Sequence, residues 1–145
     1  MTALEKIKTF TGKEFTASPS PFMRWLKPIV LIAEQGTLEF QYVVRGEWLN
    51  PAANLHGGVT AAIIDDIMGA TVFSLNDPNS YTTINIAVDY FSSAKADEKI
   101  IAKTHIIKKG RQFLNIECEI WNSDKSRMLA KGTSNLFKTE TKIKP

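Results

Sequence analysis

Residues 50–66 read NPAANLHGGVTAAIIDD, a loop that leads directly into an almost wholly apolar run. The adjacent Gly57 and Gly58 allow a tight turn and leave their backbone N–H groups uncovered by side chains. The residues that follow favour a helix, so these N–H groups lie in its first turn, where no intrahelical acceptor exists. Such a helix start stabilises a developing oxyanion. Two turns further on, Asp65 and Asp66 stand in apolar surroundings, where a carboxylate needs a partner or a function. The stretch therefore favours a site for attack on a carbonyl.

Composition narrows the class of protein. The 145 residues, 43% hydrophobic and 23% charged, are typical of a globular protein, and we expect a single domain over residues 1–145. The net charge of +3 comes from scattered lysines, which suits anionic ligands but predicts no nucleic-acid binding. A lone cysteine, Cys118, excludes an internal disulfide. Two widely separated histidines make a poor ligand set, so we expect no metal centre.

The amino-terminal residues show no signal-peptide pattern, and no apolar run reaches the length needed to cross a bilayer. These features predict a soluble, cytoplasmic protein with no membrane partner. Residues 1–28 are expected to form an extension with a short helix over residues 3–11, and residues 139–145 a frayed tail.

Residues 57–75 predict one long helix with apolar residues on every side, which is typical of an enclosed helix. Alternating patterns predict strands before and after it. These strands lie at about 29–34, 38–44, 83–90, 99–108, 114–121 and 127–138. The first two form a hairpin, and the last four are expected to follow one another as a meander. Because the helix fits only inside the curve of such a sheet, the expected fold is α+β.

This order of elements, together with the loop, resembles the hotdog fold. It is most similar to the acyl-CoA thioesterases of the 4-hydroxybenzoyl-CoA thioesterase superfamily, in their PaaI-like branch. The resemblance covers about residues 37–138. Its core is Asn50, then His56 with two glycines, then an acid nine residues beyond the histidine, which is Asp65. The strand containing Thr83 also looks like the strand that follows the helix in this family.

The resemblance implies a mechanism. The Gly57 N–H would polarise the thioester carbonyl, and Asp65 would act as a general base on water or as a nucleophile. Thr83 would help to hold the water, while Asn50 and His56 would shape the loop and hydrogen-bond near the thioester. In this family the site lies at a dimer interface, so Asp65 and Thr83 would face Gly57 and Asn50 of the other subunit. A homodimer or a tetramer of two dimers is implied.

Four further residues are candidates for binding the substrate: Gly58, Asp66, Lys109 and Arg111. Asp66 lies on a different helix face from Asp65, which favours a structural role. The two basic residues suit the phosphates of coenzyme A, but an ordinary charged hairpin explains them as well. The residues of the motif also have purely structural interpretations, because glycine pairs and Asn-Pro are common in turns and threonine is common in strands.

The sequence is consistent with three candidate functions. The first is hydrolysis of an acyl-CoA without a cofactor, for which one base and one oxyanion donor suffice. The others are an acyl-CoA-sensing module and a dehydratase or hydratase of acyl thioesters. Burial in an apolar helix would raise the pKa of Asp65 and make it a better base. The family usually has glycine at the position of Ala53, so a positive φ there would strain the loop. The acyl group, aromatic or medium-chain, stays open.

Overall fold

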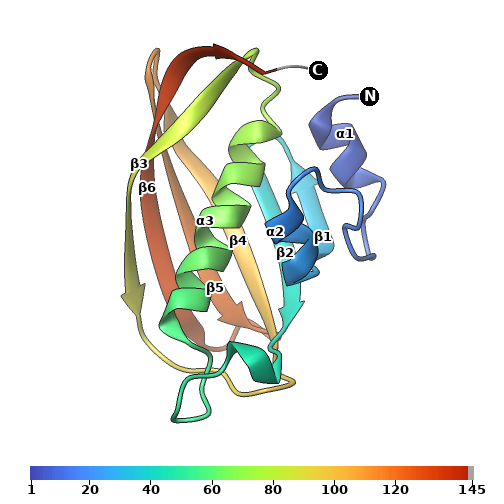
Figure 1. Ribbon diagram of the computed structural model, residues 1–145, viewed down its shortest axis with the longest axis vertical. Helices are drawn as coiled ribbons and strands as arrows, with labels where there is room; N and C mark the ends of the chain where they lie inside the picture. Colours follow the sequence, from blue (N-terminus) through green and yellow to red (C-terminus); the bar gives the residue numbers. More distant parts are fainter. Residues whose placement is uncertain (144–145) are drawn as a thin grey trace.

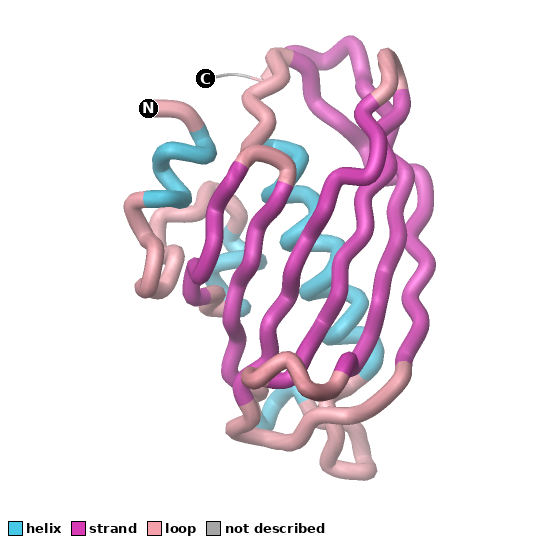
Figure 2. Tube along the Cα trace, turned by 180° about the vertical axis from the view of Figure 1, so that it is seen from behind, coloured by secondary structure: helices cyan, strands magenta, loops and turns pink. Residues whose placement is uncertain are grey.

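The structure is a computed structural model that describes residues 1–143, and it contains one curved sheet and one long helix (Figure 1). Its elements in chain order are α1 (Ala3–Lys8), α2 (Pro21–Leu26), β1 (Ile29–Glu34), β2 (Thr37–Val43), the 3-10 turn η1 (Gly46–Trp48), α3 (Gly57–Phe73), β3 (Asn79–Tyr90), β4 (Lys99–Lys109), β5 (Phe113–Asn122) and β6 (Met128–Lys142). The expected α+β hotdog fold is confirmed, since α3 lies across one face of the sheet and the sheet curves around it (Figures 1 and 2).

The six strands are antiparallel, in the order β1-β2-β4-β5-β6-β3. The expected meander is confirmed for β4, β5 and β6, which are neighbours in chain order, but it is wrong for β3. β3 pairs with β6 at the far edge, and residues 91–98 carry the chain back to β4 in the middle of the sheet. Alternation marks a strand and its buried face, but it does not identify the neighbouring strand. The order places β3 at an edge of the sheet, beside α3.

The helix α3 buries a strongly apolar face, which includes Ile63, Ile64 and Ile67, against the sheet. The fit is close: a Cβ added to Gly132 of β6 would lie 2.7 Å from Cγ2 of Ile64. Glycine is needed there because a larger residue would overpack the core. The buried hydroxyls of Thr71 and Thr104 hydrogen-bond each other at 2.6 Å, so these two polar groups under the helix have partners.

The expectation that α3 is enclosed on every side is wrong. An exposed stripe runs along the helix at Gly58, Asp65, Gly69 and Phe73. These positions lie on one face because they are separated by seven or four residues. In a single chain this face has nothing packed on it among residues 1–143, and its residues are mostly small or apolar. The helix also ends at Phe73 instead of residue 75.

The amino-terminal segment holds a second helix, α2, that the pattern of alternating serines and prolines concealed. Ser20 caps it by accepting a hydrogen bond of 3.1 Å from the N–H of Met23, and Pro21 occupies its first turn. Proline suits that position because its fixed φ matches the helix and no N–H is needed there. The predicted frayed tail is wrong as far as Lys142, where β6 ends, and residues 144–145 lie outside the described residues.

No helix within residues 1–143 combines the length and the apolarity that a membrane span requires. Over the same residues, no cluster of three or more His, Cys, Asp or Glu side chains is arranged to hold a metal ion.

Candidate active site

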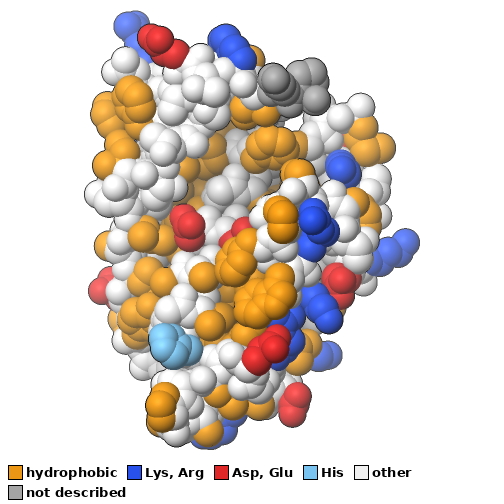
Figure 3. All heavy atoms as spheres, viewed as in Figure 1, with side chains coloured by type: hydrophobic (Ala, Val, Ile, Leu, Met, Phe, Trp, Pro, Cys, Tyr) orange, Lys and Arg blue, Asp and Glu red, His pale blue; other side chains and the backbone are white. Residues whose placement is uncertain are grey.

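A pocket of about 850 Å³ lies between α3 and the amino-terminal segment. Asp65 and Thr83 both line its wall, and so does Asp66. Apolar side chains form much of the rest; they include Ile7, Phe15 and Met23 of the amino-terminal segment, Phe73 of α3, and Ile143. Figure 3 shows this side of the molecule, where acidic side chains lie among apolar ones. The pocket offers an anionic group in surroundings that suit an apolar chain or ring.

The burial of the two acids differs from the expectation: Asp66 is the more buried of the two, and Asp65 is exposed. Asp65 belongs to the exposed stripe of α3, so the prediction that it is buried is wrong for the single chain. Asp66 is half-buried, and its Oδ2 atom is enclosed with no hydrogen-bond partner among residues 1–143. Burial, with a smaller contribution from the charge of Asp65, raises the pKa of Asp66 to about 7. A pattern that is apolar on every side could not show which of two adjacent acids points inward.

The loop before α3 is held by the side chain of Asn50. Its Oδ1 accepts hydrogen bonds from the N–H groups of Ala52, at 3.0 Å, and Asn54, at 3.1 Å. The backbone closes the same turn, since the N–H of Asn50 donates to the carbonyl of Asn54 at 2.8 Å. Asn50 therefore has the turn-forming role that its purely structural interpretation predicted. The amide nitrogen of its side chain has no acceptor among residues 1–143.

The first turn of α3 presents one N–H group. His56 caps the helix, because its Nδ1 accepts a hydrogen bond of 2.8 Å from the N–H of Gly58. That bond removes the Gly58 N–H from the groups that could bind a substrate, contrary to the expectation. The N–H of Gly57 has no acceptor within residues 1–143. Within the described residues it therefore remains available to hydrogen-bond a bound group at the helix start.

Tyr90 is a residue of this region that the sequence did not suggest. Its hydroxyl donates a hydrogen bond of 2.7 Å to the carbonyl of Gly57. Its ring lies 3.4 Å from the position that a Cβ on Gly57 would occupy. Tyr90 ends the alternating strand β3, and nothing in that alternation indicates that it reaches the start of the helix.

The acid and the amide are too far apart to act on one thioester within one chain. Gly57 and Asp65 belong to the same straight helix, eight residues apart. At a rise of about 1.5 Å per residue they are separated by about 12 Å along the helix axis. In the reaction, the carbonyl that is bound to the Gly57 N–H must lie within about 3 Å of the water that is bound to Asp65. Within residues 1–143 these two groups therefore do not form one site.

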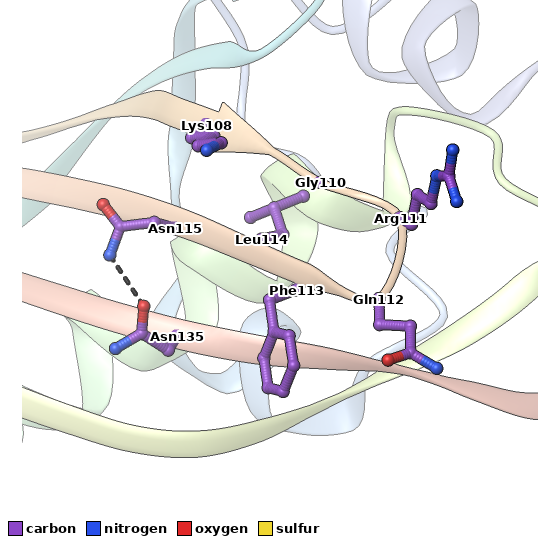
Figure 4. A pocket seen from close by; sticks show the side chains of 8 residues that line it. All are labelled: Lys108, Gly110, Arg111, Gln112, Phe113, Leu114, Asn115 and Asn135. Carbon is purple, nitrogen blue, oxygen red and sulfur yellow. Dashed lines mark hydrogen bonds between the residues drawn. The ribbon is translucent and has the colours of Figure 1, made fainter.

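The basic candidates of the β4–β5 hairpin are divided between the two sides of the sheet. Lys109 makes an ion pair of 3.7 Å with Asp77, which lines the pocket of Asp65. Arg111 instead lines a separate hollow of about 770 Å³ beside Phe113, Asn115 and Asn135 (Figure 4).

This hollow faces away from α3. Leu114 and Leu136 point into the core, so the neighbouring Asn115 and Asn135 point to the other face of the sheet. There the amide of Asn115 donates to Oδ1 of Asn135 at 2.9 Å. The structure therefore does not bring Lys109 and Arg111 together as one phosphate-binding cluster.

The loop carries the strain that the sequence suggested. Ala53 has a φ of 60°, in the left-handed region that costs a non-glycine residue about 1–2 kcal/mol. Replacing Ala53 with glycine is expected to raise the free energy of unfolding by about 0.5–1 kcal/mol, because part of the relief is offset by the larger entropy of the unfolded glycine. Urea denaturation would measure the change. A loss of stability would show that the loop does not hold this conformation in solution. Gly46→Ala, at a site with open space around it, is a control for the opposite exchange.

The comparisons with known proteins agree with this geometry. The family model of the thioesterase superfamily matches residues 52–128. Acyl-coenzyme A thioesterase 13 of Homo sapiens is 27% identical over 112 residues, which cover 77% of this chain and 80% of that protein. The range of the family model includes α3, Asp65 and Thr83 and begins after Asn50.

Solved structures share the fold. The PaaI protein from the phenylacetic acid degradation operon of E. coli superimposes with a TM-score of 0.82 and 15% identity, over 99% of this chain and all of that one (100%). A hypothetical thioesterase of Streptococcus pneumoniae, solved with coenzyme A, gives a TM-score of 0.72 and 24% identity, over 79% of this chain and 87% of that one. The family model covers more than half of the sequence. The chain therefore belongs to the thioesterase superfamily, as a hotdog-fold thioester hydrolase.

Proposed function

We propose that this chain hydrolyses acyl-CoA thioesters to a free acid and coenzyme A, in a site that two subunits build together. The observation that carries the proposal is a Gly57 N–H without an acceptor within residues 1–143, together with an acid, Asp65, that lines the same largely apolar pocket as Thr83. Such a pair supplies the two groups that thioester hydrolysis needs: a base for water and a donor for the oxyanion. The match to acyl-coenzyme A thioesterase 13 supports acyl-CoA as the substrate.

The chemistry follows from these groups. Asp65 accepts a proton from a water molecule that Thr83 helps to orient, and the water oxygen attacks the thioester carbon. The carbonyl oxygen becomes negative and accepts a hydrogen bond from the Gly57 N–H. The C–S bond then breaks, the carboxylic acid forms, and the proton held by Asp65 passes to the departing sulfur. Asp65 could instead attack the carbonyl directly as a nucleophile, in which case water hydrolyses the resulting anhydride.

Assembly into a dimer explains how groups about 12 Å apart can meet. The exposed stripe of α3 presents Asp65 to a neighbour. Beside it, β3 is an edge strand that pairs only with β6 within residues 1–143. Its side chains Ile84 and Ile86 are 53% and 37% exposed. A long edge strand with exposed apolar side chains is a surface on which another chain readily pairs. A two-fold axis through this surface would place Asp65 of one subunit near Gly57 of the other.

The amino-terminal extension contributes to the same site. Ile7, Phe15 and Met23 line the pocket from one side. We infer that they close the far end of the space in which the acyl group lies, and that its size and shape select the acyl group. Both an aromatic ring and a medium-length chain suit apolar walls.

The test is the release of coenzyme A from a panel of phenylacetyl-, benzoyl-, hexanoyl- and palmitoyl-CoA, followed with a thiol reagent. The protein's own thiol does not interfere, because Cys118 is fully buried and burial raises its pKa. Turnover of at least one member is expected. Binding without turnover of any member would instead support the sensing module. A calorimetric titration with coenzyme A would separate this outcome from a protein that binds none of them.

A further inference from the structure

The mechanism above does not use Asp66, an ionisable group of the pocket. Asp66 lines the same pocket as Asp65, and the two carboxyl groups belong to successive residues of α3. Oδ2 of Asp66 is sealed from water and has no hydrogen-bond donor among residues 1–143. An enclosed carboxylate oxygen without a donor is costly, so the neutral acid is the stable form of this group below about pH 7.

The groups that face Asp66 contribute no compensating positive charge. From β2, the phenol of Tyr42 is fully buried and its hydroxyl is also unpartnered within the described residues. Burial, and then the nearby Asp66, raises the pKa of Tyr42 well above its ordinary value. From β5, Cys118 is buried and neutral. On its own helix, the neighbour of Asp66 is the acid Asp65.

Two charged residues line the pocket further away. Lys6 of α1 is one, and Asp77, after α3, is the other. Asp77 is already bound to Lys138 at 2.8 Å. Nothing among these groups pairs with Asp66, so its ionisation adds an uncompensated negative charge beside Asp65.

We propose that Asp66 is a positioning residue of the active site that controls the basicity of Asp65 through its own charge. The inference rests on the proposed role of Asp65 as the base. When Asp66 is neutral, Asp65 is the only carboxylate at the reacting water. When Asp66 loses its proton, the added negative charge strengthens the hold of Asp65 on the proton that it takes from water.

The sign of the pH dependence follows from the charge of Asp66. A general base acts only without its proton, which gives the profile its first rise. A second rise follows through about pH 7, where Asp66 ionises, because the added negative charge lowers the barrier to proton removal. We expect the second rise to increase kcat by about 3- to 10-fold. Over the same range KM should increase, since the acyl-CoA is itself an anion and meets a second negative charge.

The experiment is the profile of kcat against pH, from pH 5 to 9, for the wild type and for Asp66→Asn, with the panel member that turns over fastest. Asparagine keeps the shape of the side chain and stays neutral. The variant should therefore lose the second rise: the ratio of its rates at pH 8.5 and pH 6 should fall to about 1. Asp89→Asn is the matched control, because Asp89 is an exposed acid that does not line the pocket. It removes one negative charge and should keep the second rise.

The outcomes separate the two proposals. A second rise that persists in Asp66→Asn, or a wild-type profile with a single step, overturns the role of Asp66 and leaves the thioesterase proposal intact. A loss of the rise in both Asp66→Asn and Asp89→Asn also overturns it, because a general change of charge would then suffice. Absence of turnover by the wild type overturns the proposed function and this inference together. The wild-type profile decides the question even if the variant does not fold.

Discussion

Replacing Asp65 with asparagine is expected to lower kcat by about 10²-fold or more, because a positioned general base typically contributes 10²- to 10⁴-fold. Asparagine keeps the size and the polarity of the side chain but cannot accept the proton of the attacking water. Asp65 is exposed on α3 and makes no ion pair within residues 1–143. The exchange should therefore leave the fold intact. Coenzyme A release measures the effect, and circular dichroism checks the fold.

One result would contradict the proposed role of Asp65. Turnover that is unchanged in Asp65→Asn would keep the activity and remove Asp65 from the reaction. The carboxyl of Asp66 would then be the nearest alternative base in the pocket, and Asp66→Asn would carry the large loss. Asp89→Asn serves again as the control for the loss of one charge.

Replacing Gly57 with proline is expected to lower kcat by about 10²- to 10³-fold, the usual effect of deleting one oxyanion donor. Proline has no N–H, and the first turn of a helix tolerates it well. The preceding His56 already has φ −63° and ψ 133°, the extended conformation that a residue before proline adopts. The variant therefore removes the donor while retaining the helix start. The effect should appear in kcat more than in KM, because the oxyanion exists only in the transition state.

Gly57→Ala is the matched control for that variant. It retains the N–H and adds a Cβ that would lie 3.4 Å from the ring of Tyr90, an ordinary contact distance. A loss of activity in the alanine variant as large as that in the proline variant would mean that crowding against Tyr90, and not the missing donor, is responsible. Equal activity of the proline variant and the wild type would exclude Gly57 as the oxyanion donor.

The sequence predicted the helix start and its loop well, because the information there is local. The adjacent glycines mark the turn at which the helix begins, and α3 does begin at Gly57. The spacing to Asp65 then fixes its position on the same helix. The positive φ of Ala53 also follows from a single position at which the family usually has glycine. Each of these features depends on residues close together in the chain.

The remaining errors concern contacts between distant residues. The position of β3 beside β6 depends on the path of residues 91–98, which alternation does not encode. Which of Asp65 and Asp66 is buried depends on how α3 is rotated against the sheet, and an evenly apolar helix gives no signal of that rotation. The hydrogen bond from Tyr90 to Gly57 joins residues 33 positions apart.

The most direct test of the shared site mixes two inactive chains, Asp65→Asn and Gly57→Pro, and measures coenzyme A release after the subunits have exchanged. If two subunits build each site, a mixed dimer contains one site with an intact Asp65 and an intact Gly57. With random pairing, the mixture should recover about one quarter of the wild-type activity, since half of the dimers are mixed and each has one intact site of two. Activity that stays at the level of the separate variants would contradict the account, because every site would then take both groups from one chain.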